Sequence, residues 1–255
     1  MPALPDLSKL SVTQFAERFR GEMIPLSNTF SYFCASVPMS EEDLKEYLEE
    51  PVAALPPTIA QALPKISILL VPYLERGDGH EKRKATLPGS DYVSIERPPE
   101  GRLSPYTQLK MGEETVLAFA LKDQEVAEYH YRFYHLLATL MAEHWSDDVE
   151  TRYMRVLRDE LSADVHGEVD EPSWRLKQAM RRSLNVRNGK AFREYARQSF
   201  ADTLTLYLHG ICCDIDVDTG PRQLPSRYLR KRLLLLEELF APPSGYAVFP
   251  EQLEA

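Results

Sequence analysis

The sequence predicts a predominantly helical α+β protein, with a small, mostly antiparallel sheet in the N-terminal half and a block of five helices after it. Short apolar segments rich in β-branched residues occur before residue 122, whereas apolar residues recur at helical spacing from residue 123 onward. Strands followed by helices is the order typical of an α+β arrangement. We therefore expect a single globular unit over 1–255, with a subdivision into a mixed region, 1–122, and a helical region, 123–255.

Capping patterns mark two helix starts in the first region, at Ser11 and at Ser40. The first helix is expected to run to about Met23, and Pro51 is expected to close the second. Apolar, β-branched segments then predict three strands, at 65–74, 92–96 and 114–121.

Five helices are predicted in the second region. Asp170 before Pro172, the turn at Asn188-Gly189 and Ser226 after Pro225 provide starting signals for three of them. The predicted helices cover about 123–145, 148–165, 172–184, 190–208 and 226–240.

The chain is acidic, with a formal net charge of −9 over 255 residues. This charge would repel a phosphate backbone, so we expect no nucleic-acid partner. Two short basic clusters, 80–84 and 227–232, are interpreted as solvated surface. No segment approaches the roughly 18 consecutive apolar residues that a membrane span needs, so we expect a soluble protein without a membrane partner.

Three cysteines, two of them adjacent, do not form the framework that secreted proteins use. The N-terminus also has no basic segment followed by an apolar run. The expected location is therefore cytoplasmic.

The predicted helix at 123–145 carries two histidines on different faces. His130 falls within an apolar stripe, whereas His135 falls on the opposite face beside Glu128 and Arg132. Because the two imidazoles point about 140° apart at roughly 100° per residue, they cannot bind one ion from an intact helix.

Two carboxylates of the next helix, Glu160 and Asp164, lie within or at the edge of its apolar arc, where a charge needs a partner. A turn near Ser146 would fold the two helices into an antiparallel hairpin and bring His130 level with Asp164. The sequence thus predicts a meeting of His130, Glu160 and Asp164. These ligand types suit a divalent metal such as zinc, iron or manganese. The alternatives are a buried, paired histidine that fixes the hairpin, or carboxylates that reach solvent where the helix ends.

A second group of metal-ligand types follows the helix at 190–208. It comprises His209, Cys212, Cys213 and Asp214. The group could bind zinc, although a second ligand pair is not evident and small buried cysteines are common in protein cores.

The order of elements loosely resembles that of zincin metallopeptidases, with a small sheet, a helix carrying a histidine and a later helix carrying Glu194. The defining His-Glu-x-x-His motif is absent, because the corresponding residues are His135-Leu136-Leu137-Ala138-Thr139. The resemblance implies a degenerate, peptidase-related domain without activity.

The leading hypothesis is a non-catalytic helical protein that binds a protein partner, a second copy of itself or a small ligand. It is favoured because a nucleophile elbow, a P-loop and a dinucleotide-binding fingerprint are all absent. The alternative is a metal-dependent hydrolase or oxidoreductase with its site between the two central helices.

Overall fold

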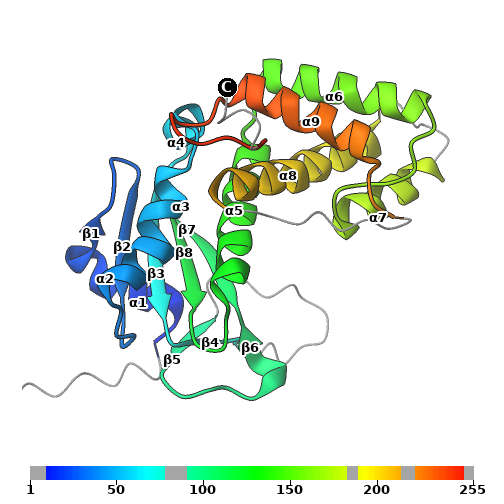
Figure 1. The fold of residues 1–255 in the computed structure, drawn as a ribbon. Helices are drawn as coiled ribbons and strands as arrows, with labels where there is room; N and C mark the ends of the chain where they lie inside the picture. The colour runs from blue at the N-terminus through cyan, green and yellow to red at the C-terminus, as the bar shows by residue number, and fades with distance from the viewer. Residues whose placement is uncertain (1–9, 78–90, 183–188, 214–221, 250–255) are drawn as a thin grey trace, which may run out of the picture. The chain divides into compact units, whose positions relative to one another are not determined.

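A computed structural model describes residues 10–77, 91–182, 189–213 and 222–249. The chain divides into two compact units. Unit 1 comprises Met1–Val52 and Leu63–Arg132, and unit 2 comprises Ala53–Ala62 and Phe133–Ala255. The predicted fold class, α+β with mostly helices, is confirmed (Figure 1).

Unit 1 is built on a five-stranded sheet in the order β1-β2-β3-β8-β7. The pairs β2-β3 and β3-β8 are parallel, whereas β1-β2 and β7-β8 are antiparallel. The strands are β1 (Ile24–Pro25), β2 (Phe30–Cys34), β3 (Lys65–Val71), β7 (Tyr106–Met111) and β8 (Glu114–Ala120).

The centre of this sheet is parallel, although antiparallel pairs outnumber parallel pairs among the described strands of unit 1, as we expected. The reason for the parallel centre lies in β3, where every residue after Lys65 is buried. Burial of nearly every residue is typical of a parallel strand that is covered on both faces. The second sheet of unit 1 is antiparallel, in the order β5-β4-β6, with β4 (Tyr73–Glu75), β5 (Tyr92–Ser94) and β6 (Leu103–Ser104).

The N-terminal helix α1 (Val12–Phe19) begins with the predicted capping box, in which the Ser11 hydroxyl accepts from the Gln14 amide N–H. Its buried residues Val12, Phe15 and Ala16 belong to the core that also contains residues of β3, β4, β5, β7 and β8. A short 3₁₀ turn, Arg20–Glu22, follows α1, and another, Glu100–Arg102, precedes β6.

Ser40 caps α2 (Glu41–Leu44) as expected, but Pro51 does not close the helix. A π-helical turn, Lys45–Glu49, leads directly into α3 (Glu50–Ala53), and α4 (Pro57–Ala62) follows. The wider π turn changes the hydrogen-bond pattern just before the proline, which has no N–H to donate.

All five predicted C-terminal helices are present, each within four residues of its predicted ends. The first of them, α5, begins in unit 1 and continues into unit 2. The helices are α5 (Val126–Glu143), α6 (Asp147–Ser162), α7 (Glu171–Arg181), α8 (Lys190–Cys212) and α9 (Ser226–Leu239).

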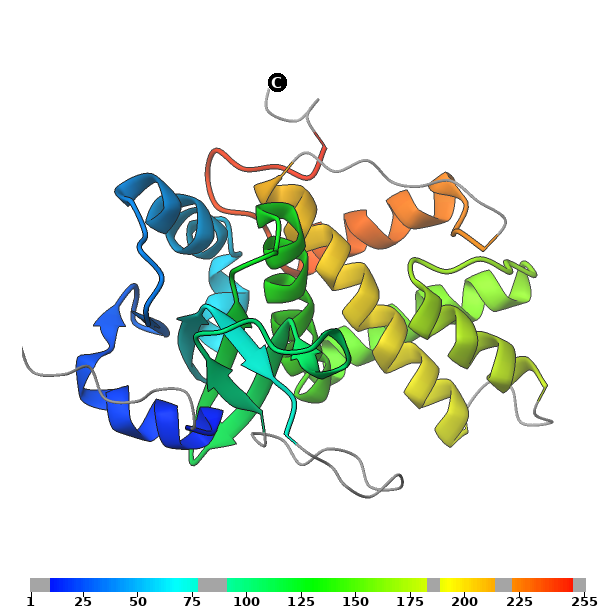
Figure 2. The same cartoon turned by 90° about the horizontal axis from the view of Figure 1, so that it is seen from below.

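In unit 2, α7 packs along α8, and α6 packs against α8 and α9 (Figures 1 and 2). The main packing partners of α6 are therefore α8 and α9 rather than α5, so the predicted antiparallel hairpin of α5 and α6 does not form. None of the helices in the described ranges combines the length and apolar character needed to cross a bilayer.

Candidate functional site

Four charged side chains are buried together inside unit 2. Glu160 lies on α6, Glu168 on the segment between α6 and α7, Lys177 on α7 and Arg232 on α9. Each of the four is at most 1% exposed. Two carboxylates and two cations balance in charge, and such burial is tolerable only when the charges are paired and hydrogen-bonded.

Arg232 is held between the two carboxylates. Its Nε and Nη2 donate to the two oxygens of Glu160 at 3.0 and 2.5 Å, and its Nη1 and Nη2 donate to the two oxygens of Glu168 at 2.8 and 3.0 Å. Nη1 also donates to the Ser199 hydroxyl at 2.8 Å. All five N–H groups of the guanidinium are thereby used.

Glu168 accepts hydrogen bonds from four different side chains. Besides Arg232, these are Lys177 at 3.0 Å, Ser199 at 3.2 Å and the Tyr195 hydroxyl. Burial alone would raise the pKa of Glu168, but the charge and hydrogen bonds of Arg232, with Lys177, outweigh burial and lower the pKa to about 2. The carboxylate therefore stays ionised.

The backbone at Gly167 brings Glu168 to this position. The Glu168 N–H donates to the Arg222 carbonyl, and the Leu224 N–H donates to the Glu168 carbonyl, so this segment pairs with the residues before α9. A Cβ at Gly167 would lie 2.0 Å from the Gln223 carbonyl oxygen, so a larger residue does not fit. The Lys177 ammonium also donates to the Gly167 carbonyl at 2.8 Å.

We call Glu160, Glu168, Lys177, Arg232, Tyr195 and Ser199 the sealed network. It joins all four helices α6 to α9. Its charged groups are buried and paired with one another, so it acts as a structural ion cluster that fixes the helices.

The sequence pattern indicates that Glu160 is buried, but it does not identify its partner. The prediction that the basic cluster 227–232 is solvated surface is wrong for Arg232, which is buried. The signal was available, since Arg232 falls in line with the buried Leu229, Leu233 and Leu236 at helical spacing.

The three residues of the predicted metal site have separate partners. Glu160 binds Arg232 through both oxygens, whereas the Asp164 side chain is 78% exposed and pairs with Arg181 at 3.0 Å. His130, in unit 1, is buried and donates from Nε2 to the Glu46 carbonyl at 2.8 Å. Burial of His130 and Glu160 agrees with their expected place on apolar faces, but the two carboxylates do not share a partner.

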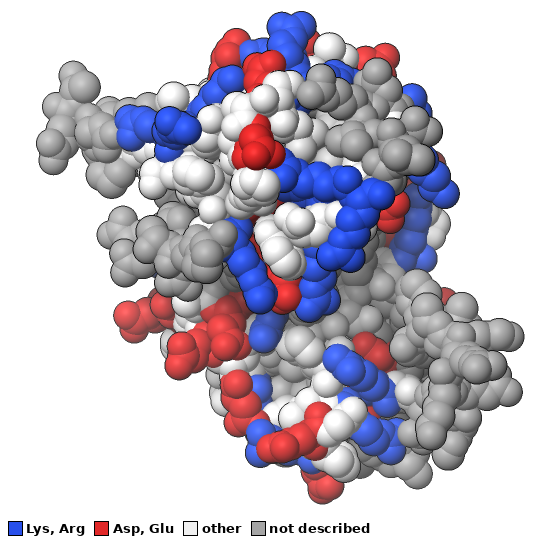
Figure 3. Space-filling view, turned by 90° about the vertical axis from the view of Figure 1, so that its right-hand side faces the viewer, with Lys and Arg blue, Asp and Glu red and all other residues white. Residues whose placement is uncertain are grey.

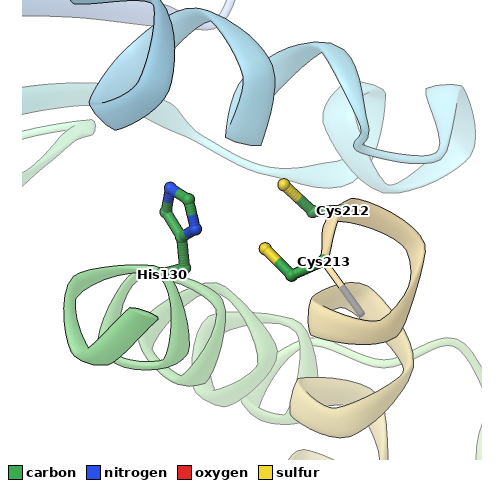
Figure 4. Close-up of side chains that lie close together, drawn as sticks. All are labelled: His130, Cys212 and Cys213. Atoms are coloured by element: carbon green, nitrogen blue, oxygen red, sulfur yellow. The ribbon is translucent and has the colours of Figure 1, made fainter. Parts of the chain in front are cut away.

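The secondary candidates for metal ligands also have separate partners. Glu128 pairs with Arg132 at 3.2 Å, and His135 Nδ1 lies 3.5 Å from the Thr205 hydroxyl. The His209 ring packs against Tyr134, with 6.2 Å between centroids. Figure 4 shows the side chains of Cys212 and Cys213 at the end of α8, and that of His130 on α5. Asp214 lies outside the described residues.

Within either unit taken alone, no three His, Cys, Asp or Glu donor atoms of the described residues lie within 4.8 Å of one another. The zincin-like interpretation required Glu194 near His135. His135 lies against Thr205, eleven residues further along α8, which corresponds to about 16 Å of helix. Glu194 and His135 therefore do not share a site.

A pocket of about 380 Å³ lies between α6 and the first turn of α8. The Arg158 guanidinium lies over the ring of the buried Phe192, 5.2 Å from its centroid, and the exposed Arg193 lines the same pocket. The remaining lining residues are Glu150, Thr151 and Met154.

Exposed basic residues continue from this pocket along α8 and to the end of α7. Lys190, Arg193 and Arg197 recur at helical spacing on one face of α8, and Arg182 follows α7. None of these four forms a salt bridge with an acidic side chain of the described ranges. We call these four residues the basic stripe. Figure 3 shows Lys and Arg side chains gathered on the upper part of the face that includes α7.

Comparison with protein families, with characterised proteins and with solved structures finds no match for this chain.

Proposed function

We propose that this protein is a non-catalytic binding protein, and that unit 2 binds an acidic segment of a partner protein through the basic stripe. The observation that carries the proposal is the difference between two sets of exposed cations. Arg175, Arg222 and Lys231 each lie within 4.0 Å of an acidic side chain of unit 2, whereas the four residues of the stripe pair with no described acid. The stripe is thus available to acidic groups of a partner.

The sealed network supports a binding role. It ties α7 and α8, which carry the stripe, to α6 and α9 through paired, hydrogen-bonded charges. A surface on fixed helices loses little conformational entropy when it binds. The ionisable groups of the network are buried, so they supply no accessible acid, base or nucleophile.

The size of the stripe and the charge of the chain favour a protein segment over nucleic acid. The three stripe residues on α8 lie within a segment of eight residues, whose first and last Cα atoms are about 10 Å apart along the helix. This length matches a few carboxylates of a peptide, whereas a nucleic acid presents a long phosphate backbone to a chain of net charge −9.

The test measures binding of a fluorescently labelled glutamate-rich peptide by anisotropy. The variant Arg182→Gln/Arg193→Gln/Arg197→Gln should bind roughly tenfold more weakly, because each exposed charge contact contributes about 0.5 kcal/mol. The matched control is Arg175→Gln/Arg222→Gln/Lys231→Gln, which removes the same charge from cations already paired.

Equal weakening in the two triple variants would show a general charge effect and would contradict the proposal. A single-stranded DNA of equal charge serves as a second probe. Tighter binding of the DNA than of the peptide would contradict the proposed partner class. Binding of the peptide should also weaken as the salt concentration rises.

A further inference from the structure

We infer that the pocket between α6 and α8 binds a small organic oxyanion, a carboxylate or a phosphate ester, that carries an amine or hydroxyl at its other end. This inference goes beyond the proposed protein partner and does not depend on it. The pocket volume of about 380 Å³ lies within the range of small-molecule sites.

The positive end of the pocket is formed by Arg158 and Arg193. The Arg158 guanidinium lies over the ring of Phe192, 5.2 Å from its centroid, and this aromatic contact restricts its orientation. A planar guanidinium held in one orientation presents paired N–H donors that match the oxygens of a carboxylate or phosphate. Arg193 adds a second positive charge to the same pocket, which favours an anion there.

The other end of the pocket is formed by the beginning of α6, since Arg158 lies further along the same helix. Glu150 and Thr151 lie on its first turns, and Glu150 precedes Arg158 by eight residues, or about 12 Å of helix. Met154 lies between them and supplies apolar contact. The pocket therefore has two arginines at one end, Met154 in the middle, and the Glu150 carboxylate and Thr151 hydroxyl at the other end.

This order of groups selects the ligand class. An ammonium or hydroxyl group on the ligand can donate to the Glu150 carboxylate while its oxyanion accepts from the arginines. An ion without a donor at its other end leaves Glu150 without a hydrogen-bonding partner from the ligand and places a second negative charge in the same pocket. The lining residues therefore favour an elongated ligand with opposite ends over a compact anion.

The test uses the full chain and four small probes in NMR titrations. The probes are 6-aminohexanoate, 4-aminobutyl phosphate, hexanoate and hexylamine. The first two should bind saturably, and the tighter of them identifies a carboxylate or a phosphate as the preferred oxyanion. Hexanoate, which lacks the amine, and hexylamine, which lacks the oxyanion, should each bind several-fold more weakly.

Three variants connect binding to the pocket. Arg158→Lys keeps the charge but loses the paired donors, and it should weaken binding of the preferred probe about tenfold. Glu150→Gln should reduce the preference for 6-aminohexanoate over hexanoate. Arg155→Gln is the matched control, because Arg155 is exposed on the same helix but does not line the pocket.

The inference is overturned if no probe binds saturably, or if Arg158→Lys and Arg155→Gln bind the preferred probe alike. Equal affinity for hexanoate and 6-aminohexanoate would overturn the assignment of the amine end. Folding of each variant is checked by circular dichroism. Because the probes are small and no peptide is present, this result is independent of the proposed acidic partner.

Discussion

Arg232 and Arg193 belong to the same helical unit, but their surroundings are opposite. Arg232 is completely buried, and all five of its N–H groups donate to protein oxygens. Arg193 is exposed on α8 and forms no salt bridge with a described acid. The buried Arg232 therefore serves the stability of the unit, whereas the exposed Arg193 can contact a binding partner.

The difference has an energetic consequence. When a buried cation is removed, its carboxylates remain buried without a compensating charge, which costs much free energy. Removal of an exposed cation costs little, because water solvates the groups around it. The sealed network should therefore dominate the stability of unit 2, and the basic stripe should contribute almost nothing to it.

The largest effect is expected for Arg232→Met. The substitution leaves Glu160 and Glu168 buried without their shared cation, so the free energy of unfolding should fall by about 3–5 kcal/mol. Urea unfolding followed by circular dichroism measures it. Lys231→Gln, at the exposed neighbouring position, should change stability by less than about 1 kcal/mol. Similar values for the two variants would refute the structural role of the network.

The next largest effect is a dependence of the free energy of unfolding on pH, which arises from Glu168. Its pKa is about 2 in the folded protein, below the ordinary value of 4.5, so its ionised form stabilises the fold. This stabilisation is complete above about pH 5 and is lost as the pH falls through the range down to about 2. Its size is about 3 kcal/mol, from about 1.4 kcal/mol for each pKa unit.

The measurement compares urea unfolding of the natural protein and of Glu168→Gln across this pH range. The variant should be less stable at neutral pH, and the gap between the two proteins should close as the pH falls. A gap that stays constant down to pH 2 would show that Glu168 is not ionised in the folded state.

Local signals in the sequence predicted the helices well. Ser11 with Gln14, and Ser40 with Asp43, form the capping boxes that the structure contains. Each of these signals acts over three residues, so neighbouring residues alone determine it. The parallel pairing of β3 with β2 and β8 was not predicted, because it joins segments that are distant in the sequence. The strand β7 was also not predicted, although it pairs with the next strand, β8.

The sealed network was predictable only in part, for the same physical reason. Glu160 could be identified as an anomaly because it stands on an apolar arc, but its partner Arg232 is 72 residues away. The position of Lys177 also indicates burial, because it lies at helical spacing between the buried Ser173 and Met180. A sequence can indicate that a charge is buried, whereas the identity of its partner depends on tertiary packing.

A smaller effect is expected for Gly167→Ala. The added Cβ would lie 2.0 Å from the Gln223 carbonyl oxygen, so the backbone that carries Glu168 must shift. Forcing a methyl group into such a close contact typically costs about 1–3 kcal/mol. Gly101→Ala is the control, because a Cβ there meets nothing within 4 Å. Equal stability of the two variants in thermal unfolding would show that Gly167 is not required for the pairing.

The smallest effect on stability is expected for Arg182→Gln/Arg193→Gln/Arg197→Gln. These side chains are exposed and form no salt bridge with a described acid, so each substitution should change the free energy of unfolding by less than about 0.5 kcal/mol. Removing Arg193 and Arg197 can even stabilise the unit slightly, because it relieves the repulsion between like charges four residues apart on α8. The same variant should still lose most of its affinity for the acidic peptide. If it loses stability as Arg232→Met does, the stripe is part of the structure, and the contrast between buried and exposed arginines fails.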